Sequence, residues 1–164
     1  TSEPLTLDRA TSADAPALCR LIRAAYKGLA TLGLNFTGTV QSDEMTKRMI
    51  ARHDVYIARK GDRMIGTLTM HQDILEGDRK CLYLNRLAVD PAATPEESAA
   101  CLLRLVKLVE TEAVRLKLPI IRLDSAATLE RLARFCKHIG FAAISESQWP
   151  GKTYRSVIME KTLK

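Results

Sequence analysis

Cysteine and histidine are the side chains best suited to act as nucleophiles, bases or metal ligands, and this sequence has few of either. Its four cysteines, Cys19, Cys81, Cys101 and Cys136, include no CxxC pair and have no histidine at metal-ligand spacing. The three histidines are also far apart in the chain. We therefore expect no metal site, no disulfide framework and no histidine-based triad, and we expect the cysteines to be small buried hydrophobic residues.

A second candidate for chemistry is the segment 28–40, GLATLGLNFTGTV. It contains three glycines and no sustained hydrophobic period, which predicts a loop between two helices. Asn35, Phe36 and Thr37 give its centre a polar and aromatic character. Two interpretations stay open, a surface connection and a loop that binds an acceptor substrate.

The elements that position these residues can be followed along the chain. Residues 5–9 alternate apolar and polar side chains, as a half-buried strand does. Thr11 and Asp14 then resemble the capping box of a helix, and the apolar face of that helix carries Leu18 and Ile22. A second helix is predicted at 43–53. Residues 55–59 and 64–71 flank a short glycine-containing turn and predict a hairpin, which a third strand at 81–90 continues.

The C-terminal half begins with the longest predicted helix, residues 95–117. Thr94 as N-cap, Pro95 at the first helical position and Glu97 at the third combine the capping box with the proline preference. An apolar strand at 119–125 and a helix at 127–138, stopped by Gly140, come next. Two closing strands, at 141–145 and 156–161, complete the order.

This order, with LNRLAVDP (84–91) leading into the long helix and RLDS (122–125) and LARFCKHIGF (132–141) after it, resembles the Gcn5-related N-acetyltransferase (GNAT) family over nearly the whole chain. WPGKTYRSVIMEK (149–161) is similar to the closing hairpin of many members. The resemblance implies an α/β (α+β) fold in which a mixed, mostly antiparallel twisted sheet of about six or seven strands is flanked by about four helices. Residues 1–164 would form a single domain.

The resemblance also implies acetyl-CoA as co-substrate. In the family the fourth and fifth strands splay apart, and the pantetheine arm pairs with backbone groups of the fourth strand. Leu87, Ala88 and Val89 match those positions. Since backbone pairing is indifferent to side-chain identity, we expect this part of the site to be kept.

The loop for the pyrophosphate is where the sequence departs from the family pattern of an arginine or glutamine followed by glycines. The matching positions are Thr94, Pro95, Glu96, Glu97, Ser98 and Ala99. Bare N–H groups at a helix start bind phosphates, but proline has no N–H, the threonine hydroxyl occupies a donor and two carboxylates repel the anion. We expect weak binding here, with Arg131 on the following helix as a compensating cation.

For catalysis, the family commonly uses a glutamate on the fourth strand as base and a tyrosine on the fourth helix as acid. Asn85, which cannot titrate, stands near the first position, and Cys136 stands at the second. Tyr154 and Tyr83 are alternative acids. Asn35, Phe36, Thr37 and Tyr83 are expected to line the acceptor side of the site.

The predicted function is acyl-CoA-dependent N-acetylation of a small-molecule or amino-acid-like amine. The alternatives are a degenerate member that serves as a binding or scaffold module and an acyltransferase with another donor.

The apolar runs are short and no signal peptide is evident, which predicts a cytoplasmic protein away from membranes. The net charge of +6 comes without a nucleic-acid-binding motif, so no nucleic-acid partner is expected. A homodimer through the closing strand stays possible.

Overall fold

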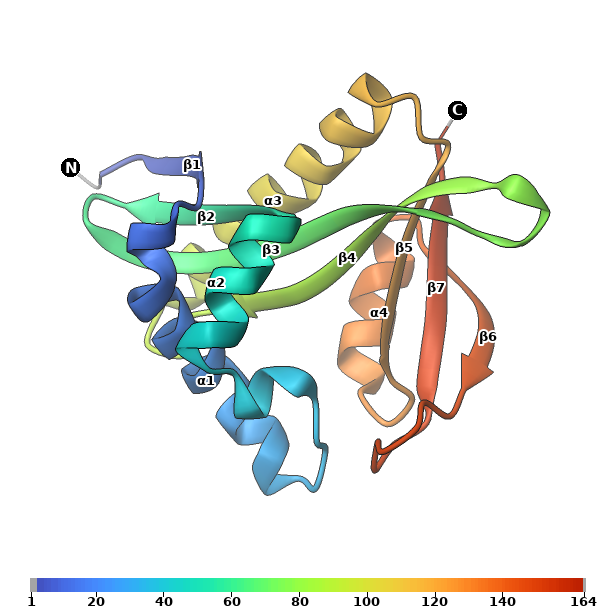
Figure 1. The fold of residues 1–164 in the computed structure, drawn as a ribbon, viewed down its shortest axis with the longest axis horizontal. Coiled ribbons are helices and arrows are strands. Elements are labelled where there is room, and N and C mark those ends of the chain that lie inside the picture. The colour runs from blue at the N-terminus through green and yellow to red at the C-terminus, as the bar shows by residue number, and fades with distance from the viewer. Residues whose placement is uncertain (1–2, 164) are drawn as a thin grey trace.

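A seven-stranded sheet organises the chain in a computed structural model that describes residues 3–163 (Figure 1). The strands are β1 (Leu5–Arg9), β2 (Asp54–Lys60), β3 (Arg63–Ile74), β4 (Lys80–Val89), β5 (Ile120–Ala126), β6 (Ala142–Ser147) and β7 (Ser156–Thr162). The helices are α1 (Ala15–Thr31), α2 (Asp43–Arg52), α3 (Pro95–Arg115) and α4 (Glu130–His138). Short 3₁₀ turns lie at Ser12–Asp14, Thr37–Val40 and Glu76–Asp78.

The strands lie in the order β1-β2-β3-β4-β5-β7-β6, and every neighbouring pair is antiparallel except β4 with β5. The predicted mixed, mostly antiparallel sheet with four helices is confirmed. The parallel pair is short: Cys81, Leu82 and Tyr83 pair with Ile120, Ile121 and Arg122. Within residues 3–163 the two strands form no further pairs, and Figure 1 shows them running apart.

Helices cover both faces of the sheet. Figure 1 shows α1 and α2 in front of strands β2 to β4, with α3 behind them. Leu18 and Ile22 of α1 pack with Ile57 on the first face, whereas Leu105 and Val109 of α3 belong to a larger cluster on the second. Burial of these apolar side chains, at about 25 cal/mol per Å², supplies the driving force that joins the layers.

Three helices end with the same hydrogen-bonding motif. The first residue past the C-cap of α1, α3 and α4 is Gly33, Lys117 and Gly140, with φ of 78°, 58° and 103°. In each case the N–H groups of this residue and the next bond back to carbonyls of the last turn, which is the Schellman arrangement. Glycine suits this left-handed conformation, whereas lysine is strained in it.

Two helix bounds differ from the sequence prediction. α1 continues to Thr31, because Gly28 is accommodated in the helix interior and the stop comes at Gly33. α4 begins at Glu130 rather than Ala127, since Leu129 has φ −86° and ψ 71°, outside the helical region. The segment 28–40 is therefore a loop only from residue 32 onward.

Candidate active site

A β-bulge in β4 lies beside the point where β4 and β5 separate. Thr67 pairs with Ala88 and Thr69 with Asn85, so two β4 residues between them face a single residue of β3. One of the two, Arg86, has φ 51°, an unusual value for a residue with a side chain. Arg86 Nε donates to Gln41 Oε1 at 3.1 Å, which fixes the guanidinium against the start of α2.

Beyond the bulge, the backbone of β4 faces the gap that opens where β4 and β5 separate. Asp90 N–H donates to the Ile65 carbonyl at 2.7 Å, and Val89 is the partner of Gly66. Because hydrogen-bonded and non-bonded pairs alternate in an antiparallel ladder, the amide and carbonyl of Val89 point away from β3, toward β5. The Leu87 carbonyl already accepts a hydrogen bond from the Tyr26 hydroxyl at 3.0 Å. Of the three predicted pantetheine-pairing residues, Val89 has the freest backbone groups.

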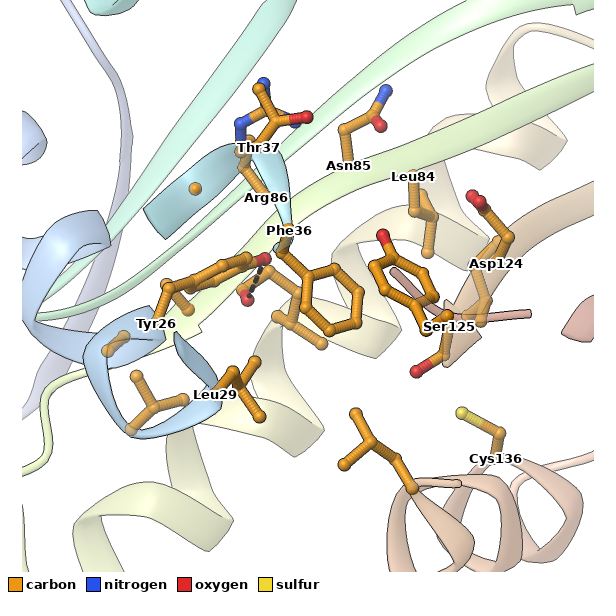
Figure 2. A pocket seen from close by; sticks show the side chains of 18 of the residues that line it. Tyr26, Leu29, Phe36, Thr37, Leu84, Asn85, Arg86, Asp124, Ser125 and Cys136 are labelled. Atoms are coloured by element: carbon orange, nitrogen blue, oxygen red, sulfur yellow. Dashed lines mark hydrogen bonds between the residues drawn. The ribbon is translucent and has the colours of Figure 1, made fainter. Parts of the chain in front are cut away.

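A cavity of about 390 Å³ occupies the gap, and Figure 2 shows it from close by. Asp124 and Ser125 enter from β5, and the Cys136 thiol points into it from α4. The other lining residues come from α1, residues 36–38, β4, α3, Leu123 of β5, Leu129 before α4 and the loop at 149–154. Among the predicted site residues, the cavity brings together Phe36, Thr37, Asn85, Leu87, Ala88, Val89, Cys136 and Tyr154.

Asp124 is the carboxylate of this cavity, and the sequence analysis did not single it out. Its Oδ1 accepts a hydrogen bond from the Tyr83 hydroxyl at 3.0 Å, and its Oδ2 accepts one from Trp149 Nε1 at 3.1 Å. Two neutral donors thus fix the carboxylate at the cavity wall. The available signal was Asp124 as the one acidic residue of β5, within the RLDS motif. Tyr83, which was expected to line the acceptor side, is not among the described lining residues, although its hydroxyl contacts Asp124.

Ser125, next to Asp124, has a buried hydroxyl without a hydrogen-bond partner in the described structure. Ser125 is 7% exposed and lines the cavity, and its buried Oγ has no hydrogen-bond partner among the described residues. A buried hydroxyl without a partner costs about 1–3 kcal/mol. A polar ligand atom in the cavity would relieve that cost.

The predicted catalytic residues have different environments. Asn85 Nδ2 lies 3.3 Å from His71 Nδ1. Burial raises the pKa of the Cys136 thiol to about 11, so that thiol is a weaker acid than an ordinary alkyl thiol. The Tyr154 ring stacks on Phe36 with centroids 4.5 Å apart, and burial raises the pKa of its hydroxyl as well. Both groups are protonated at neutral pH.

A set of hydrogen bonds closes one side of the cavity, and we name it the clasp: residues 33–37 bonded to residues 151–153. Asn35 Nδ2 donates to the Gly151 carbonyl at 2.7 Å, and the Thr153 N–H donates to Asn35 Oδ1 at 2.7 Å. Lys152 Nζ donates to the Asn35 carbonyl at 3.0 Å and to Thr37 Oγ1 at 2.9 Å. Burial, and next the nearby Arg86 charge, lower the pKa of Lys152. Asn35 and Thr37 therefore have structural partners beside the cavity.

The start of α3 contains the predicted capping box. Glu97 N–H donates to Thr94 Oγ1 at 3.1 Å, and Thr94 N–H donates to Glu97 Oε1 at 3.0 Å. Glu97 Oε2 also lies 3.3 Å from Lys60 Nζ and 3.2 Å from Arg63 Nη1. The Glu97 charge is therefore compensated, which leaves Glu96 as the carboxylate able to repel an anion.

The other predicted cofactor-binding residues are those at the start of α3 and Arg131. Residues 94–99 do not contribute to its described lining. Arg131 lies on α4, and its side chain falls outside the described part of the structure. In residues 3–163, no group of three or more His, Cys, Asp and Glu side chains is arranged to hold a metal ion. None of the helices in that range has the length and apolar character needed to cross a bilayer.

Comparison with known proteins identifies the fold. No protein-family model matches the sequence, and no curated protein matches it. An N-acetyltransferase from Staphylococcus aureus Mu50 has a similar structure, with a TM-score of 0.74 at 13% identity over 97% of each chain. yncA from Salmonella typhimurium, solved with acetyl-CoA, gives 0.72 at 17% identity over 98% of this chain and 94% of its own. A GNAT family acetyltransferase from Elizabethkingia anophelis, also with acetyl-CoA bound, gives 0.67 at 14% identity over 97% and 98%. The chain therefore has the fold of the Gcn5-related N-acetyltransferases.

Proposed function

We propose that the chain is an acetyl-CoA-dependent N-acetyltransferase acting on a small amine. The observation that carries the proposal is the gap between β4 and β5, where the outward-facing backbone of Val89 and a carboxylate, Asp124, share one cavity. Similar structures solved with acetyl-CoA support the same co-substrate here. The pantetheine arm would pair with β4, and its amide would offer a partner to the Ser125 hydroxyl.

The phosphates of CoA would lie at residues 94–99 with help from Arg131. Pairing of Glu97 with Lys60 and Arg63 removes part of the repulsion that the sequence predicts there. The remaining obstacles are the missing N–H of Pro95 and the charge of Glu96. We therefore expect acetyl-CoA affinity to depend more on the pantetheine arm than on the pyrophosphate.

In the proposed reaction, Asp124 holds the acceptor ammonium and takes up its proton through solvent. The free amine attacks the thioester carbonyl, so that the new C–N bond forms as the C–S bond breaks. The departing thiolate takes a proton from Tyr154 or Cys136, and the second proton that the amine nitrogen loses returns to that group. Tyr154 is the stronger candidate, because it is only half-buried beside Phe36, whereas Cys136 is buried. Asn85 would orient the acceptor.

One observation favours a second function, a binding module without turnover. The cap of α3 uses backbone N–H groups that a phosphate cradle would need, because the Thr94 hydroxyl and Glu97 occupy them. A chain that binds amines or peptides in the clasped cavity but holds no CoA would keep every other feature described here.

Calorimetric titration with acetyl-CoA, followed by measurement of CoA release with a panel of amines, separates the two functions. The enzyme proposal expects heat at submillimolar acetyl-CoA and release of CoA with at least one amine. Asp124→Asn should lower kcat about 10²- to 10⁴-fold while acetyl-CoA affinity changes little. Glu146→Gln, which removes a carboxylate from β6 outside the cavity, is the matched control. Absence of acetyl-CoA binding would reject the enzyme and favour the binding module.

A further inference from the structure

A second cavity, of about 340 Å³, opens beside the gap on the face of the sheet that α2 covers. Arg48 and Arg52 reach it from α2 and Arg86 from β4, and no carboxylate side chain contributes to its described lining. We call these three residues the arginine cluster. Neutral groups, including Gln41, Thr69 and Asn85, complete the lining.

The arginine cluster has no counter-charge in the described structure. Within residues 3–163, no carboxylate oxygen lies within 4.0 Å of a guanidinium nitrogen of Arg48, Arg52 or Arg86, although other arginines such as Arg59 and Arg122 have such partners. Arg48 and Arg52 are exposed and Arg86 is half-buried, and three cations that line one cavity without an anion favour the binding of an anion there. His53, which also lines this cavity, has its pKa lowered by burial and then by the charges of His71, Arg52 and Arg86.

One member of the cluster is held in place by a buried network. Gln41 is 2% exposed; its Oε1 accepts from Arg86 Nε at 3.1 Å, and its Nε2 donates to Thr46 Oγ1 at 3.0 Å. The bulge in β4 sets the backbone of Arg86 in its unusual conformation. An arginine positioned in advance loses less conformational entropy when it binds an oxyanion.

The second cavity adjoins the reaction site, because Asn85 and Arg86 line both cavities. Asp124 provides one carboxylate in the gap, where Lys152 adds a further cation. A molecule spanning both cavities would thus meet a carboxylate at one end and arginines at the other. That arrangement suits an amine that also bears a negative group.

We propose that the arginine cluster binds an oxyanion carried by the acceptor, so that the acceptor class is an amine bearing a carboxylate, phosphonate or phosphate group. The proposal rests on the proposed acetyltransferase function and adds the acceptor's charge to it. Guanidinium groups bind such oxyanions through paired, charge-assisted hydrogen bonds. The cluster lies against α2, whereas the proposed CoA phosphate site lies at α3, so the two anion sites can be tested separately.

The first test uses inorganic phosphate and needs no turnover. Calorimetry should show phosphate binding to the native chain, weakened at least about tenfold in Arg48→Gln/Arg52→Gln, since each lost charged hydrogen bond is worth roughly tenfold or more. Arg20→Gln/Arg23→Gln is the matched control, because it removes the same charge from exposed positions of α1. Equal binding by the two double variants, or no binding by any, would overturn the proposal.

The second test compares three amines with one spacer: β-alanine, 2-aminoethylphosphonate and the neutral β-alaninamide. With CoA present, the two anions should bind more tightly than the amide by about tenfold or more, and only the arginine-cluster variant should lose the difference. The ratio between the first two distinguishes carboxylate from phosphonate recognition. An amide that binds as well as the anions would contradict the proposed acceptor class.

Acetyl-CoA titration of the same variants separates this inference from the proposed function. Arg48→Gln/Arg52→Gln should keep native acetyl-CoA affinity. A parallel loss of acetyl-CoA affinity would mean that the cluster binds the cofactor's phosphates, which would overturn the acceptor role. If acetyl-CoA fails to bind the native chain while phosphate binds the cluster, the acetyltransferase proposal falls and the acceptor assignment falls with it.

Discussion

At the scale of single residues, Glu97 links helix capping to the charge balance near the proposed cofactor site. Its carboxylate accepts the Thr94 N–H and faces Lys60 and Arg63, and these contacts, the backbone hydrogen bond first, lower its pKa. A group whose pKa is lower in the folded state stabilises that state above its unfolded pKa, and the contribution is lost as the pH falls through the folded pKa.

Glu97→Gln should therefore lower the free energy of unfolding at about pH 7, and its difference from the native chain should vanish well below about pH 4. Urea unfolding at several pH values measures this difference. Glu96→Gln is the control, because Glu96 forms no ion pair in the described structure. Parallel pH profiles for the two variants would contradict a specific role for Glu97.

The residue scale also shows which site features a sequence can reveal. The capping box at Thr94 and Glu97 was predictable, because both of its hydrogen bonds join residues three apart. The role of Asp124 depends on Tyr83 and Trp149, which are distant in the chain. The arginine cluster likewise combines α2 with a bulge in β4. Nothing local to Arg86 marks it as part of a cavity.

At the scale of elements, the Schellman motifs that end α1, α3 and α4 do not all have glycine at the left-handed position. Lys117 holds the left-handed position after α3, where α1 and α4 have glycine. Lys117→Gly should raise the free energy of unfolding by about 1 kcal/mol, because it removes the strain of a side chain at positive φ. Thermal or urea unfolding measures the change.

Gly140→Ala is the reciprocal variant. It should destabilise by at least about 1 kcal/mol, since it introduces the same strain and its Cβ would lie 3.1 Å from Lys161 Cε. Changes of the same sign in the two variants would show that the left-handed conformation does not determine the effect.

The clasp is a second feature at this scale. Asn35→Ala removes the acceptor of the Thr153 N–H and the donor to the Gly151 carbonyl. We expect amide exchange at residue 153 to accelerate, and the apparent KM for the acceptor to rise if the cavity opens. Gln148→Ala is the control, because Gln148 bonds only within its own turn, to the carbonyls of Lys152 and Tyr154. Unchanged exchange at Thr153 in Asn35→Ala would argue against the clasp.

The elements themselves were largely predictable, and the exceptions have physical causes. Periodicity and caps gave the order of strands and helices, including the alternation in β1 and the proline start of α3. The end of α1 was misplaced because segment 28–40, with three glycines and no hydrophobic period, predicts a loop, although the decisive signal is the left-handed Gly33. The clasp was not predictable, since its partners are more than 100 residues apart in the chain.

At the scale of the whole molecule, the net charge of +6 predicts salt-sensitive binding of anions. The affinity for acetyl-CoA should fall several-fold between about 0.05 M and 0.3 M salt, because screening shortens the reach of the positive charges. Affinity for pantetheine, which lacks the phosphates, should change little. Calorimetry at the two salt concentrations makes the comparison, and equal salt dependence of the two ligands would contradict an electrostatic contribution.

The short β4–β5 pairing has a mechanical consequence. Strands β1 to β4 and strands β5, β7 and β6 form two half-sheets that share a seam of only a few residues near Cys81 and Ile120. A molecule bound in the gap would contact both half-sheets where β4 and β5 no longer pair. With the molecule bound, the two half-sheets would unfold as one unit, whereas without it the C-terminal half would open first. Amide hydrogen exchange in β7 would therefore slow when a ligand binds along β4.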